Sequence, residues 1–183
     1  MKRGFKLLAL GLCLALALTG CQKLKDSVVD HKALVKETLA RSYTFDAEIT
    51  YSGTTVLGQI EKTKEADLTI TFAEPAAFNG LVVTVQGEEV RAQYLGMELD
   101  LSVFEIPTQA VPTLVREVLT GGQADKMTVQ VEEDTVVASG SILIAAYDIV
   151  FDKDTMAICS ISVPSADAEL VASNFTFTDG RQQ

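Results

Sequence analysis

The sequence has little of what most active sites are built from. Its 183 residues include no tryptophan, three cysteines and a single histidine, His31. A single histidine cannot form a multi-histidine zinc site, and no spacing of cysteine and histidine in the sequence is typical of zinc ligands. No glycine-rich phosphate loop precedes a predicted helix, and Ser139-Gly140-Ser141 lacks the second glycine of a nucleophile elbow. We therefore expect no catalytic residues, no metal and no cofactor, and we predict that the protein is not an enzyme.

Positive charge is also scarce. The chain has 15 Lys and Arg against 25 Asp and Glu, which gives a formal net charge of −10 at pH 7. A body of this sign repels nucleic acid and anionic lipid surfaces, because like charges oppose close approach. The composition therefore excludes a nucleic-acid partner and favours a basic one.

The first 21 residues carry the strongest functional signal. Lys2, Arg3 and Lys6 form a basic start, and the apolar run 7–18 that follows is shorter than the roughly 20 residues of a membrane-spanning helix. The run ends in Leu18-Thr19-Gly20-Cys21, which resembles the lipobox of bacterial lipoproteins. In that family the signal peptide is removed before the cysteine, whose thiol then carries a diacylglycerol. The alternative is an ordinary secretory signal followed by an incidental cysteine.

The lipobox resemblance implies a domain organisation and a location. Residues 1–20 are then a cleaved signal peptide, 21–25 a lipidated tether, and 26–183 a single folded domain. The diacylglycerol on Cys21 would hold the protein on the extracytoplasmic face of the cell membrane. In a Gram-negative host the expected place is the outer membrane, because Gln22 is not the aspartate associated with inner-membrane retention.

From Ser42 onward apolar and polar residues alternate, which is typical of strands with one buried and one exposed face. The alternation, interrupted by turns, predicts strands at 43–51, 54–62, 66–73, 81–85, 90–94, 97–101, 127–132, 135–141, 142–151, 156–163 and 169–178. In the third of these the inward positions begin at Ala66. In strand 156–163 Cys159 shares a face with Ile161 and Val163. We therefore expect this lone domain cysteine to be a buried, inert core thiol.

Two segments have helical rather than strand periodicity. Residues 26–41 predict an amphipathic helix with Asp26 as N-cap and Val35 and Leu39 on its apolar face. Residues 107–120 predict a second helix, which Gly121-Gly122 ends. His31 lies among charged residues of the first helix, so a solvated side chain is favoured over a ligand or a base.

The order of elements resembles the LolA/LolB-like superfamily of lipoprotein carriers, which includes LppX-type lipoproteins. The residues that carry the resemblance are the first strand Phe45–Tyr51, Gly58-Gln59-Ile60 in the return strand, Leu68–Phe72 before Pro75, and Leu81-Val82-Val83 before the Gly87 turn. The family implies a mainly β (α+β) fold. We therefore expect a curved antiparallel half-barrel of about 10–11 strands, with an N-terminal helix and one mid-chain helix against its concave face. The absence of tryptophan and the chain's own lipobox depart from the soluble carrier.

The same resemblance implies a hydrophobic ligand, a lipid or a lipoprotein acyl chain, held between sheet and helices. The expected lining is Ile49, Tyr51, Ile60, Leu68, Ile70, Phe72, Val83, Tyr94, Leu114 and Leu119. For each of these side chains a place in a packed core is the alternative. The competing function is a non-catalytic adaptor that holds a cell-wall or envelope protein at the membrane, as GerS-like lipoproteins do. An exposed edge strand and the acidic surface are the features that would serve such an adaptor.

Overall fold

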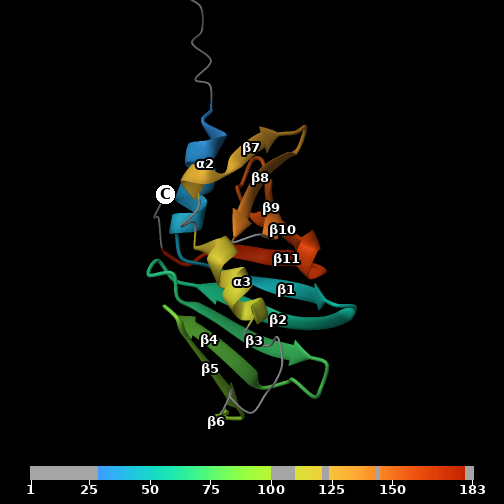
Figure 1. Ribbon diagram of the computed structural model, residues 1–183. Helices are drawn as coiled ribbons and strands as arrows, with labels where there is room; N and C mark the ends of the chain where they lie inside the picture. The colour runs from blue at the N-terminus through green and yellow to red at the C-terminus, as the bar shows by residue number, and fades with distance from the viewer. Residues whose placement is uncertain (1–28, 100–109, 121–123, 143–144, 180–183) are drawn as a thin grey trace, which may run out of the picture. The chain divides into compact units, whose positions relative to one another are not determined.

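The structure is a computed structural model that describes residues 29–99, 110–120, 124–142 and 145–179 (Figure 1). The chain divides into two compact units, 1–30 and 31–183. The expected signal peptide, Cys21 and the N-cap Asp26 lie outside the described residues. No described helix is long and apolar enough to cross a membrane.

One antiparallel sheet dominates the unit 31–183. Its strands are β1 (Tyr43–Tyr51), β2 (Thr54–Lys62), β3 (Leu68–Glu74), β4 (Leu81–Gln86), β5 (Glu89–Tyr94), β6 (Met97–Leu99), β7 (Thr128–Val131), β8 (Thr135–Ile142), β9 (Ala145–Asp152), β10 (Ile158–Val163) and β11 (Ala168–Phe177). Their order is β6-β5-β4-β3-β2-β1-β11-β10-β9-β8-β7, so the eleven described strands form an open sheet that ends at β6 and β7. The first and last strands pair side by side in its middle. The predicted mainly β half-barrel is confirmed.

Two α-helices accompany the sheet in the described part of the chain. They are α2 (His31–Ala40) and α3 (Ala110–Leu119), and two short 3₁₀ turns lie at η3 (Ala124–Lys126) and η4 (Pro164–Ala166). Figure 1 shows α3 lying across the sheet, where it contacts β3 and β4. We call this side of the sheet the inner face and the opposite side the outer face. Val35 and Leu39 of α2 are buried, as their spacing predicts.

Three residues differ from their sequence-based expectations. Ala66 does not start β3, because it adopts a left-handed φ of 67° in a turn where its amide donates to the Thr63 carbonyl. Cys159 is half-buried rather than buried, since a register shift between Ile158 and Ser160 removes it from the row of Ile161. Burial nevertheless raises the pKa of its thiol, and the nearby Asp152 acts in the same direction. His31 is half-buried, and its Nδ1 is enclosed with no hydrogen-bond partner in the described part of the chain.

A buried lysine joins α2 to the sheet. Lys62, at the end of β2, is 1% exposed, and its Nζ donates to the carbonyl oxygens of Leu39 at 2.5 Å and Arg41 at 2.9 Å. Carbonyls at the end of a helix have no partner within the helix and carry its negative partial charge, so a cation there is favourable. The Nζ also lies 5.3 Å from the Tyr43 ring centroid. Burial lowers the pKa of Lys62 to about 8, although Asp179 and Glu65 oppose the shift.

An ion pair closes the same corner of the molecule. Arg41 Nε and Nη2 donate to Asp179 Oδ1 at 3.0 and 2.9 Å, and the guanidinium lies 3.5 Å from the Phe177 ring centroid. The end of α2 is thereby fixed to the residues that follow β11. Arg41 also holds the pKa of the Asp179 carboxyl below its usual range.

Replacing Lys62 with Met should remove a pH dependence of stability. Because the pKa is 10.5 in the unfolded chain and about 8 in the folded one, the unfolded state binds more protons between those values. The free energy of unfolding of the wild type should therefore rise by about 2 kcal/mol relative to Lys62→Met as the pH goes from 7 to 10. Denaturant titrations at each pH measure the difference. A difference that does not change with pH contradicts the prediction.

Tyr147 is another buried polar side chain, and its surroundings differ from those of Lys62. Tyr147 in β9 is 2% exposed and packs over Gly140 in β8, its register partner. A Cβ added at Gly140 would come within 2.5 Å of the ring, which explains why a glycine is found there. The Tyr147 hydroxyl is buried and has no hydrogen-bond partner among the residues that the structure describes. An unpaired buried hydroxyl is unfavourable, because it has lost its bonds to water without replacement.

Removal of this hydroxyl should therefore stabilise the fold. Tyr147→Phe keeps the ring, and we expect its free energy of unfolding to exceed that of the wild type by about 1 kcal/mol. Thermal or chemical unfolding of the two proteins provides the test. If the phenylalanine variant is less stable, the hydroxyl has a partner such as a buried water molecule.

Candidate hydrophobic-ligand site

A small pocket lies between α3 and the inner face of the sheet. Its volume is about 20 Å³, and its lining is Ile49, Leu114, Val115, Val118, Ile161, Val163, Ala168, Glu169 and Leu170. These residues come from β1, α3, β10 and β11. The site is thus formed where the mid-chain helix meets the paired first and last strands.

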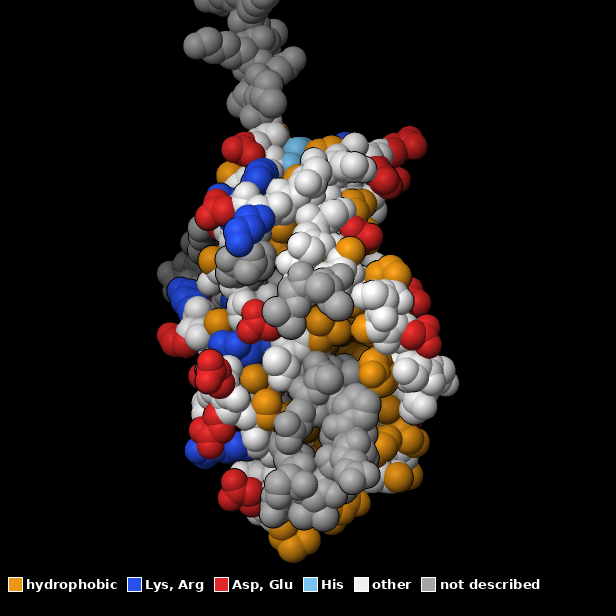
Figure 2. All heavy atoms as spheres, in the orientation of Figure 1, with side chains coloured by type: hydrophobic (Ala, Val, Ile, Leu, Met, Phe, Trp, Pro, Cys, Tyr) orange, Lys and Arg blue, Asp and Glu red, His pale blue; other side chains and the backbone are white. Residues whose placement is uncertain are grey.

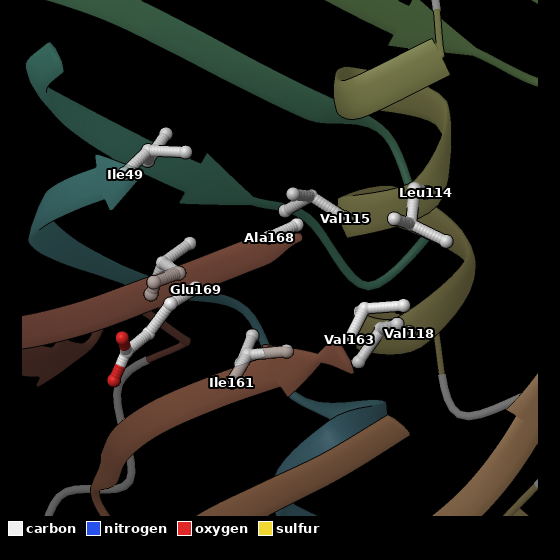
Figure 3. A pocket seen from close by; sticks show the side chains of 9 residues that line it. Ile49, Leu114, Val115, Val118, Ile161, Val163, Ala168 and Glu169 are labelled. Atoms are coloured by element: carbon white, nitrogen blue, oxygen red, sulfur yellow. The ribbon is translucent and has the colours of Figure 1, made fainter. Parts of the chain in front are cut away.

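The side chains that meet in this pocket are aliphatic. Figure 3 shows Val115 and Val118 of α3 on the side of the helix toward Ile161 and Val163 of β10. The carboxylate of Glu169 points away from this group. The pocket therefore offers an apolar surface and no converging polar groups, which suits a hydrocarbon rather than a polar substrate.

The pocket has room for about one water molecule. Sites for small-molecule ligands occupy roughly 300–1,000 Å³. The described residues of α3, β10 and β11 are thus packed together around a small space. An acyl chain would fit only after α3 moved away from these strands.

The predicted lining residues fall into three groups. Ile49 and Leu114 line the pocket. Ile60, Leu68, Ile70 and Leu119 are fully buried in the core, and Val83 is 6% exposed. Tyr51, Phe72 and Tyr94 are half-buried.

Most of the remaining lining residues come from the second half of the sheet. Val115 and Val118 are three residues apart in the helix predicted over 107–120, and Ile161 and Val163 alternate correctly in their strand. Their inward direction could be derived from the sequence. The periodicity does not predict that β11 pairs with β1. This pairing brings Leu170 opposite Ile49.

Two of the most exposed large hydrophobic side chains lie at the end of the sheet near β6. Leu95 and Met97 are 70% and 64% exposed, and Phe78 on the neighbouring turn is 39% exposed. The Leu95 amide donates to the Gly80 carbonyl oxygen, which brings the two turns together. Figure 2 shows hydrophobic side chains at this end of the molecule. Exposed apolar side chains thus gather at the β6 end of the sheet.

Among the described residues, no group of three or more His, Cys, Asp and Glu side chains has the arrangement of a metal site. No protein-family model and no curated protein matches the sequence.

Solved structures do match. An uncharacterized conserved protein from Thermus thermophilus has a TM-score of 0.51 at 12% identity, over 86% of this chain and 91% of that one. At this identity the likeness shows a shared fold and nothing about activity.

Two other matches carry family names. A putative outer membrane lipoprotein-sorting protein domain from Vibrio parahaemolyticus has a TM-score of 0.42 at 9% identity, over 84% of this chain and 93% of that one. A LolA superfamily protein from Nitrosomonas europaea has a TM-score of 0.29 at 13% identity, over 82% and 73%.

Proposed function

We propose that this protein is a lipid-anchored protein of the cell envelope that binds a hydrophobic ligand between α3 and the inner face of the sheet. The ligand class is a lipid or a lipoprotein acyl chain. The observation that carries the proposal is the aliphatic contact of α3 with β10 and β11, which encloses the pocket of about 20 Å³. Its lining would extend from the pocket residues to the apolar inner-face residues predicted from the sequence.

The way α3 is held supports an opening at this pocket. Val115 and Val118 contribute aliphatic contacts, which have no directional requirement and can re-form against a hydrocarbon chain. In the described part of the chain, Arg116 Nε of α3 donates to the Ala66 carbonyl at 3.0 Å, and the Tyr43 hydroxyl donates to the Leu119 carbonyl at 3.4 Å. These bonds hold the C-terminal half of the helix while its first turns separate from the strands.

Ligand binding is tested on residues 22–183, which contain the complete compact unit 31–183. We expect native mass spectrometry of protein purified without detergent to show an adduct that extracts into organic solvent and is identified as lipid. Ala168→Leu should lower the occupied fraction at least fivefold, because the added methylenes fill the space beside Leu114 and Val118.

The matched control adds bulk on the other side of the same strand. Val171→Leu lies on the outer face, so its occupancy should equal that of the wild type. A clean mass for the wild type, together with no uptake of added phospholipid, contradicts ligand binding. Equal effects of the two substitutions contradict this location for the site.

The anchor is tested separately. Cys21→Ser removes the thiol that would carry the diacylglycerol, so we expect the variant to move from the membrane fraction to the soluble or secreted fraction. Cys13→Ser, within the signal segment, is the matched control and should stay with the membrane, because it leaves Cys21 in place. Retention of Cys21→Ser on membranes after a high-salt wash means that the lipobox interpretation is wrong.

A further inference from the structure

The outer face of six adjacent strands has negative charge without exposed positive charge. In the sheet these strands follow one another as β2-β1-β11-β10-β9-β8. They contain six carboxylates, at Asp46, Glu48, Glu61, Asp148, Asp152 and Glu169. Their one cation is Lys62, whose ammonium is buried beneath α2. None of the six carboxylates forms a salt bridge within the part of the chain that the structure describes.

An apolar row crosses the same face. Successive register partners place Leu57, Glu48, Val171, Ser160, Val150 and Val137 in one line from β2 to β8. Five of the six have at least one buried chain neighbour on the inner face, and Leu57 shares the face of its register partner Glu48, so these six side chains point outward. Val171 is 48% exposed and Leu57 is 37% exposed. Four of the six positions are therefore aliphatic, and the other two of these four, Val150 and Val137, are half-buried.

Carboxylates border this row on one side. The neighbouring line runs through Ser139, Asp148, Ser162, Glu169, Thr50 and Thr55. Adjacent lines on one face of a strand are two residues apart, about 7 Å. A ligand lying on the aliphatic row would therefore have Asp148 and Glu169 within reach of long basic side chains, and Glu48 directly beneath it.

We propose that this outer-face row is a docking surface for a cationic, amphipathic segment of a protein partner. Aliphatic side chains of the segment pack on Leu57, Val171, Val150 and Val137, and its Lys or Arg side chains pair with Glu48, Asp148 and Glu169. Six strands at about 4.8 Å spacing give the row a length of about 24 Å. A helix of about 16 residues covers that distance.

Charge decides between this partner and other occupants. An anionic bilayer is repelled by a face with six carboxylates and no free cation among its described residues. A second copy of the chain would bring the same six carboxylates against one another, and such like-charge contacts disfavour association. A basic segment is attracted rather than repelled, because each of its cations meets a carboxylate that has no salt bridge among the described residues.

Docking there is independent of the ligand site on the inner face. Val171 and Leu170 are consecutive residues of β11 that point to opposite sides of the sheet. The outer surface can therefore be occupied while the inner face holds a hydrocarbon. Loss of lipid binding would leave this inference unchanged.

The test uses a synthetic 16-residue helical peptide with leucines on one face and lysines on the other. Its binding to residues 22–183 is followed by fluorescence anisotropy in about 0.15 M salt, where the Debye length is about 8 Å. We expect the double variant Leu57→Thr/Val171→Thr to weaken binding about tenfold, and Glu48→Gln/Glu169→Gln to weaken it by a similar factor. Threonine keeps the strand preference, so the sheet should stay intact.

Matched controls separate docking from general attraction between opposite charges. Glu88→Gln/Glu89→Gln neutralises two carboxylates at the turn between β4 and β5, outside the six strands, and should leave the affinity unchanged. A peptide with the same lysines and serine in place of leucine should bind at least tenfold more weakly. Absence of wild-type binding overturns the proposal. Equal weakening by the turn variant, or no effect of the threonine variant, overturns it as well.

Discussion

The bond between the Lys62 ammonium and the last carbonyls of α2 is the constraint on which the arrangement of helix and sheet depends. Lys62 ends β2, and the pairing of β2 with β1 places it beside the residues that link α2 to the sheet. Without this cation, the buried carbonyl of Leu39 at the helix end and the carbonyl of Arg41 just after it would each lose a hydrogen bond. The Arg41–Asp179 pair reinforces the same corner from the other end of the chain. An open sheet with two free edges is thus fixed near its middle, where β2, β1 and β11 lie side by side.

From that fixed middle, one sheet presents two chemically different surfaces. The alternation of side chains sends Ile49, Ile161 and Leu170 toward α3, where they meet its valines. The intervening residues carry the carboxylates and the aliphatic row of the outer face. The two faces share each strand, and Glu169 borders both, with its carboxylate pointing away from the pocket. They can therefore serve different partners. The lipid proposed for the inner face and the basic segment proposed for the outer face follow from the same period of two.

Much of this architecture could be predicted from the period of the sequence, and the failures have local causes. The strand 54–62 agrees with β2 at both ends, because alternation there is uninterrupted between two turns. The prediction for Ala66 was wrong because alternation alone cannot reveal a left-handed turn residue. The register shift at Cys159 is similarly invisible, since a bulge depends on the partner strand. Of the pocket, Leu114 follows from helical spacing, whereas the proximity of β10 and β11 to Ile49 depends on long-range pairing. The sequence did not predict that Lys62 is buried against the end of α2, because an alternating pattern does not show what a lysine at an inward position would bind.

The pairing of β1 with β11 has a consequence for how the chain reaches its native state. Thr44 pairs with Thr176, so the central contact of the sheet joins segments from opposite ends of the sequence. Such distant contacts form slowly, because a long loop must close before they are made. A chain delivered from its N-terminus keeps one edge of β1 unsatisfied until the last strand has emerged. During that interval the exposed edge can pair with other chains. Folding without pairing between chains is therefore favoured when the complete chain emerges quickly, or when the edge of β1 is covered until β11 is present.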